Sequence, residues 1–106
     1  MPEAGDGRAA QAESVRLRVP RALAADLGGE REVTVPVPED GTLAGLLDAL
    51  RTTRPALERR LRDETRALRR FVNVYVDGTD VRHGDGQATR VTGGQAVEVI
   101  QSVAGG

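Results

Sequence analysis

The first pattern along the chain is an alternation of apolar and polar residues. It occurs in "SVRLRVP" (residues 14–20) and again in "VTVPVP" (residues 33–38). A period of two is typical of a strand that buries one face. The second segment contains Pro36, which cannot donate a hydrogen bond to a sheet ladder, so we expect this strand at a sheet edge. Residues 21–32, which include two consecutive glycines, are interpreted as a connecting turn.

From Thr42 onward the apolar residues follow the period of a helix. They fall at i, i+3, i+4 and i+7, at Leu43, Leu46, Leu47 and Leu50. Either Asp40 or Thr42 is the expected N-cap, since both carry a side-chain oxygen that accepts from free backbone N–H groups. Pro55 ends this helix one or two residues earlier and opens a second helical turn. Leu57 and Leu61 continue the apolar stripe there.

The last third of the chain returns to strand patterns. The clearest strand is "FVNVYV" (residues 71–76), and the Asp-Gly pair after it is a hairpin signal. A short return strand, "TDVR" (residues 79–82), a glycine-rich loop over 83–95 and a last strand, "AVEVIQSV" (residues 96–103), follow. The order of elements predicts an α+β fold of the ubiquitin-like β-grasp type. Its mixed sheet of four to five strands would carry one main helix packed across it, with the first and last strands adjacent at the centre.

The domain organisation follows from these elements. Residues 1–13 are small and polar without a period, so we expect a disordered extension. The β-grasp domain is predicted over residues 14–102. Residues 103–106 are predicted to form a flexible C-terminal tail that ends in two glycines.

Composition excludes several classes of protein. The 106 residues carry 15 basic and 16 acidic side chains, so no polyelectrolyte partner is indicated, and every basic residue is arginine. Cysteine is absent, which excludes disulfides and thiolate chemistry. The only aromatic residues are Phe71 and Tyr75, too few for a base-stacking nucleic-acid platform. Without a membrane-length apolar run or a secretory signal pattern, the expected location is cytoplasmic.

Two further features are interpreted without a catalytic role. An arginine-rich stretch comprises Arg59, Arg60, Arg62, Arg66, Arg69 and Arg70. It suggests a nucleic-acid patch, but Glu58, Asp63 and Glu64 interrupt it, which favours a solvated helix face. His83 is the only histidine, and no second histidine or converging carboxylate pair accompanies it. It is therefore expected on the surface, and no metal site is predicted.

The terminal pair Gly105-Gly106 is the candidate for chemistry. Glycine lets an enzyme close on the main chain, because no Cβ is present. Residues 103–106, fully extended, span roughly 13–14 Å, long enough to carry a carboxylate into another protein's active site. ATP would convert that carboxylate to an acyl-adenylate, and a sulfur donor would displace AMP to leave a nucleophilic thiocarboxylate. The alternative on composition alone is an ordinary frayed chain end.

The segments "RFVNVYVDGTDVR" and "ATRVTGGQAVEVIQSVAGG" resemble the MoaD/ThiS ubiquitin-like sulfur carriers, most closely the CysO type. The resemblance runs from about residue 14 to residue 106. It implies a non-enzymatic protein substrate whose Gly106 is adenylated and then carries sulfur as a thiocarboxylate. It also implies that Val103, Ala104 and Gly105 enter the partner's channel.

The same resemblance implies the partners. A MoeB/ThiF-like adenylyltransferase would use ATP, while the carrier itself binds no cofactor. In CysO-type systems a PLP-dependent sulfhydrylase uses the sulfur on O-phosphoserine, and a zinc metallopeptidase releases cysteine. Molybdopterin-synthase small subunits often have prolines where this chain has Gln101 and Ser102, which makes that role the second choice. A ubiquitin-like modifier that forms isopeptide bonds and a plain interaction domain remain as alternatives from other classes.

Overall fold

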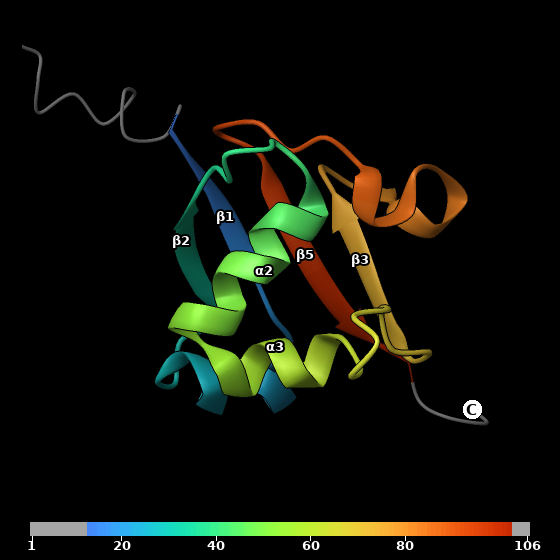
Figure 1. The fold of residues 1–106 in the computed structure, drawn as a ribbon. Helices are drawn as coiled ribbons and strands as arrows, with labels where there is room; N and C mark the ends of the chain where they lie inside the picture. The colour runs from blue at the N-terminus through green and yellow to red at the C-terminus, as the bar shows by residue number, and fades with distance from the viewer. Residues whose placement is uncertain (1–12, 103–106) are drawn as a thin grey trace, which may run out of the picture.

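The protein is described by a computed structural model, which covers residues 13–102 (Figure 1). The strands are β1 (Ser14–Arg18), β2 (Glu32–Pro36), β3 (Val72–Val76), β4 (Thr79–Asp80) and β5 (Ala96–Gln101). The α-helices are α2 (Leu43–Thr53) and α3 (Pro55–Leu61). Three short 3-10 helices are η1 (Arg21–Leu27), η2 (Val81–His83) and η3 (Gly86–Ala88).

The five strands form one mixed sheet in the order β2-β1-β5-β3-β4. β1 pairs in parallel with β5, and the β1–β2, β3–β5 and β3–β4 pairs are antiparallel. The first and last strands are therefore neighbours inside the sheet, and β2, with its Pro36, forms one edge. Both predictions are confirmed, as is the ubiquitin-like β-grasp fold.

The core lies between the sheet and the helices α2 and α3, which cover one of its faces (Figure 1). The predicted leucines of α2 are all buried, at Leu43, Leu46, Leu47 and Leu50. From the sheet, every second residue points into the same core, among them Val15, Leu17, Val74, Val97 and Val99. The other face of the sheet carries the alternate residues, and neither α-helix covers it.

The start of α2 is fixed by two side chains acting in series. Thr42 is the N-cap, and its Oγ1 accepts a hydrogen bond from the Gly45 N–H at 3.1 Å. Asp40 Oδ1 accepts in turn from both the N–H and the hydroxyl of Thr42, at 3.0 and 2.9 Å. A Cβ on Gly45 would collide with the Asp40 carboxylate, so a larger residue there would displace Asp40 from Thr42. Both predicted capping residues thus take part, Thr42 directly and Asp40 behind it.

The interpretation of residues 21–32 as a connecting turn is wrong for most of the segment. Residues 21–27 form η1, which buries Leu23, Ala24 and Leu27 in the core. Only the residues that follow turn the chain, beginning at Gly28 with φ of 68°. A short helix with three apolar contacts has no room for a full period, and for this reason the pattern did not reveal it.

The prediction of a solvated helix face for the arginine-rich stretch holds only for Arg59 and Arg60, which are exposed on α3. The helix α3 ends at Leu61, so Arg66, Arg69 and Arg70 lie beyond it. Arg62 is buried, and its Nε donates to Glu58 Oε2 at 2.9 Å, where the Glu58 side chain is also buried. Its remaining nitrogens donate to Asp48 Oδ1 at 2.8 Å and to Gln87 Oε1 at 3.1 Å. These contacts join α2, α3 and η3 around the buried Arg62 side chain.

Smaller differences concern the ends of elements. The return strand is only Thr79–Asp80, because Val81 turns inward to the core as the first residue of η2. The glycine-rich loop contains η3 and a buried Val91. The last strand ends at Gln101, two residues earlier than expected. The predicted extension, residues 1–13, lies almost entirely outside the described residues, so its character stays a prediction.

Leu46→Ala tests the core beneath α2. Leu46 is 0% exposed, and its truncation should lower the free energy of unfolding by about 2–5 kcal/mol, because the cavity cannot fully collapse. Urea denaturation measures this change. Thr52→Ala, at an exposed site of the same helix, is the matched control and should stay within about 0.5 kcal/mol of the parent protein. A loss at Leu46 no larger than that at Thr52 would contradict the assignment of α2 to the core.

Arg62→Ala tests the buried ion pair. It leaves the Glu58 carboxylate buried without a cation, so we expect a loss of about 3–5 kcal/mol. The double variant Glu58→Leu/Arg62→Met removes both charges and should recover most of that stability, because no unpaired charge stays buried. The comparison is made by urea denaturation. A double variant as unstable as Arg62→Ala would show that packing, rather than charge burial, dominates at this position.

Candidate functional site

The predicted site residues Val103, Ala104, Gly105 and Gly106 lie outside the described residues. The structure does describe the residue from which they continue, Ser102, which directly follows β5. β5 lies between β1 and β3 in the sheet, and its residues beyond Glu98 pair with β3 alone, so the chain leaves the sheet along β3. The surroundings of Ser102 therefore define the candidate site on the body of the protein.

Ser102 is held to the first residues of β3 by two hydrogen bonds. Its N–H donates to the Phe71 carbonyl oxygen at 2.7 Å. Its Oγ accepts from Nδ2 of Asn73 at 2.7 Å. The register pairs Val72 with Gln101, so these bonds extend the β3–β5 pairing by one residue beyond the strand. Asn73 reaches Ser102 as a diagonal cross-strand neighbour.

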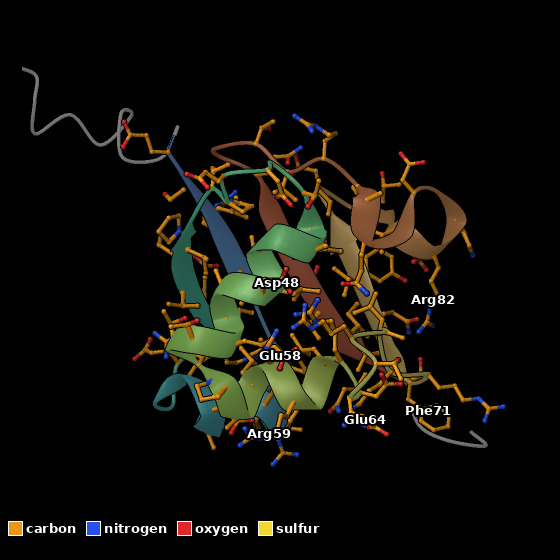
Figure 2. All side chains as sticks on the ribbon, viewed as in Figure 1. Asp48, Glu58, Arg59, Glu64, Phe71 and Arg82 are labelled. Atoms are coloured by element: carbon orange, nitrogen blue, oxygen red, sulfur yellow. The ribbon has the colours of Figure 1, made fainter. Side chains whose placement is uncertain are left out.

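Arg82 supports this arrangement from the other side of β3. Its Nη1 donates to Oδ1 of Asn73 at 2.8 Å, and its Nη2 donates to the Arg69 carbonyl oxygen at 2.9 Å. The Arg82 backbone N–H is itself held by Asp80 Oδ1 at 2.9 Å. Figure 2 shows Arg82 and Phe71 on the same side of the molecule, alongside β3. Three segments of chain therefore meet at the end of β5.

The sheet face that neither α-helix covers carries apolar surface at this same end. Phe71 and Ile100 are 42% and 41% exposed, and they are the large apolar side chains left exposed in the described part of the chain. The Arg70 guanidinium lies 5.8 Å from the centre of the Phe71 ring, within reach of a cation–π interaction. Ile100 pairs across the sheet with Asn73, beside the anchored Ser102. The chain end thus leaves next to a small apolar surface bordered by arginine.

A hollow of about 140 Å³ continues this surface toward β1. Residues of β1, the turn after it and the end of β5 line it, including Arg18, Arg31, Glu98, Ile100 and Gln101. Arg18 forms an ion pair with Glu32 at 3.3 Å, with both side chains half exposed. At about 140 Å³ the hollow is smaller than a typical small-molecule pocket, so it is better suited to contact with another protein surface.

A second hollow, of about 370 Å³, lies among the arginines after α3. The buried arginine in its lining, Arg62, has its donors occupied by Glu58, Asp48 and Gln87. Asp63 is also occupied, because it accepts from the hydroxyl and N–H of Thr65. These hydrogen bonds, led by that from the Thr65 hydroxyl, lower the pKa of Asp63 below its usual value. The hollow therefore reflects the internal ion pairs of this region rather than a ligand site.

The remaining candidates from the sequence carry no site in the described residues. His83 is exposed on η2 as predicted. Within residues 13–102, no group of three or more histidine, aspartate or glutamate side chains is placed to hold a metal ion. Nor does any helix in that range have the length and apolar character to cross a membrane.

Sequence reasoning missed the residues around Ser102. Asn73 and Ser102 are 29 positions apart, and Arg82 lies on a third segment, so no local pattern links them. One signal was available: within "FVNVYV", the alternation places Phe71, Asn73 and Tyr75 together on the face away from the valines. An asparagine between two aromatic residues on that face indicates a polar contact with a neighbouring strand.

The sequence and the fold were compared with known protein families, curated proteins and solved structures. The model of the ThiS family matches residues 22–106. The sulfur carrier protein CysO of Mycobacterium tuberculosis is 33% identical over 95 residues, which cover 88% of this chain and 99% of that protein. The small archaeal modifier protein 3 of Haloferax volcanii is 35% identical over 78 residues, covering 74% of this chain and 84% of that protein.

Among solved structures, CysO in the Amycolatopsis orientalis BexX/CysO complex superimposes with a TM-score of 0.75 at 32% identity. The match covers 87% of this chain and 99% of that one. The similarity thus extends over the whole β-grasp domain and, in the family model, to the terminal glycines. This chain belongs to the ThiS family.

Proposed function

We propose that this protein is a sulfur carrier whose C-terminal carboxylate, on Gly106, is the reactive group. The observation that carries the proposal is the family match through residue 106 on a chain whose last strand is held inside the sheet. Ser102 is fixed beside β3, so residues 103–106 extend from a defined point on a rigid body. Their extended length, roughly 13–14 Å, suffices to place the carboxylate in a partner's active site.

The proposed chemistry has two steps, both performed by partner enzymes. A carboxylate oxygen of Gly106 attacks the α-phosphorus of ATP, which forms the acyl-adenylate and releases pyrophosphate. A sulfur donor at the sulfide level then attacks the acyl carbon and displaces AMP, which leaves a thiocarboxylate on Gly106. The protein is therefore a co-substrate, and ATP is bound by the adenylyltransferase, of MoeB/ThiF type. The chain contains no cysteine or lysine that would intercept its own activated end.

The sulfur acceptor is proposed from the relatives. Two similar proteins are named CysO, which favours cysteine biosynthesis through a PLP-dependent O-phosphoserine sulfhydrylase and a zinc metallopeptidase. The apolar surface formed by Phe71 and Ile100, next to Ser102, is the contact that we assign to such partners. The similarity to a small archaeal modifier favours a second candidate, a modifier whose Gly106 becomes joined to lysines of other proteins.

Mass spectrometry tests the proposal. The protein is incubated with an adenylyltransferase of this type, ATP and sulfide. A sulfur carrier should gain the mass difference between one sulfur and one oxygen atom, at the C-terminal residue. A modifier should instead appear covalently joined to other chains when lysine-bearing proteins are added. An unchanged mass in both reactions would contradict both candidates.

Deletion of Gly106 separates chemistry from folding. We expect the shortened protein to gain no sulfur, because its terminal carboxylate is one residue short of the reacting position. Its thermal unfolding midpoint should match that of the parent protein, since the residues of the core lie between Val15 and Val99. A large loss of thermal stability would contradict the proposal that residues 103–106 act outside the core.

A further inference from the structure

The hydrogen bonds around the end of β5 form a connected chain with a direction. Arg82 Nη1 donates to Asn73 Oδ1, and Asn73 Nδ2 donates to Ser102 Oγ, at 2.8 and 2.7 Å. A guanidinium has only donors, so it holds the amide oxygen of Asn73 toward Arg82. The amide nitrogen is then directed at Ser102. Arg82 therefore sets the amide orientation in which Asn73 donates its hydrogen bond to Ser102, just beyond β5.

From this geometry we infer that Ser102, Asn73 and Arg82 act as positioning residues for the terminal carboxylate. We call these three residues the tail anchor. The inference rests on the proposed function, because it assigns the anchor a role in delivering Gly106 to a partner. Beyond the proposed function, the inference states that the tail anchor fixes the point from which the last four residues extend.

The anchor matters because the terminal segment is short. Its span is roughly 13–14 Å, and each further residue released from β5 adds about 3.3–3.6 Å to the free chain. Without Asn73, only the Ser102 N–H bond to Phe71 continues the β3–β5 ladder beyond Gln101. A released Ser102 spreads the carboxylate over a larger volume. Reaction requires the attacking oxygen within about 3–3.5 Å of the phosphorus, so fewer complexes are productive.

The tail anchor lies at the protein surface, which distinguishes a positioning role from a role in stabilising the fold. Its hydrogen bonds lie at the protein surface, and none of its members belongs to the hydrophobic core. Substitutions at surface positions away from the core usually change global stability only slightly. The anchor joins segments that the sheet already holds: Asn73 is in β3, and Arg82 follows β4. What it adds is order at Ser102.

The test uses the full-length protein with its adenylyltransferase. Asn73→Ala and Ser102→Ala remove the two ends of the bond at the strand terminus. Ser102→Thr retains the hydroxyl, and His83→Ala changes an exposed neighbour of Arg82 that makes no polar contact in the described structure. For each variant, kcat and KM are measured for adenylation, and the backbone order parameter of Ser102 is measured by NMR in the free protein.

We expect kcat to fall about three- to tenfold in Asn73→Ala and Ser102→Ala, the worth of one or two hydrogen bonds. KM for the carrier should change by less than about twofold, because Phe71 and Ile100, the residues that we assign to docking, are retained in both variants. The Ser102 order parameter should fall with kcat, while Ser102→Thr and His83→Ala should keep parent values. A general loss of folding would instead lower the thermal midpoint of the alanine variants, which we expect to be unchanged.

The two hypotheses fail in distinguishable ways. If the parent protein is not adenylated, the proposed function is wrong, and the positioning role is wrong with it. If the parent protein reacts and both alanine variants react with equal kcat, only the inference is overturned. It is also overturned if the Ser102 order parameter is unaffected by Asn73→Ala, since the Asn73 hydrogen bond would then not restrict the motion of Ser102.

Discussion

The parallel pairing of β1 with β5 is the constraint on which the rest of this structure depends. It brings the two ends of the β-grasp domain together, with Arg16 opposite Ala96 and Arg18 opposite Glu98. A parallel pair requires a long crossover, and the chain between the two strands supplies it with α2 and α3. The last strand then pairs with β1 over Ala96–Glu98 and with β3 from Val97 to Gln101. A chain end held this way starts from a fixed position.

The same topology divides the sheet into two unlike faces. The crossover places α2 and α3 on one face, where the leucines and valines close the core. The alternate residues of β3 and β5 remain on the other face, where Phe71 and Ile100 lie beside Ser102. The register of β3 against β5 thus places this apolar surface beside the end of the last strand. Under the proposed function, a partner that receives the terminal residues would contact this surface.

The sequence predicted those parts of the structure that follow a regular period. Alternation identified the strands, the leucine spacing identified α2, and the placement of Pro36 identified the edge. The helix η1 was missed because its few apolar contacts are shorter than one clear period. The pairing of Glu58 with Arg62 was missed because charges at i and i+4 usually lie in solvent. The contact between Asn73 and Ser102 depends on the register of two distant strands, which no local pattern reports.

The proposed chemistry requires little of the side chains of this protein and more of its backbone arrangement. A reactive carboxylate on the main chain, as proposed, needs no catalytic side chain of this protein. What it does need is a fixed starting point and a short connection, because a long free segment dilutes the carboxylate over a large volume. The β3–β5 ladder supplies the first, and the four residues beyond Ser102 supply the second. Under the proposed function, selectivity between partners would come from the surface around Ser102, since the terminal glycines themselves present no side chain to distinguish.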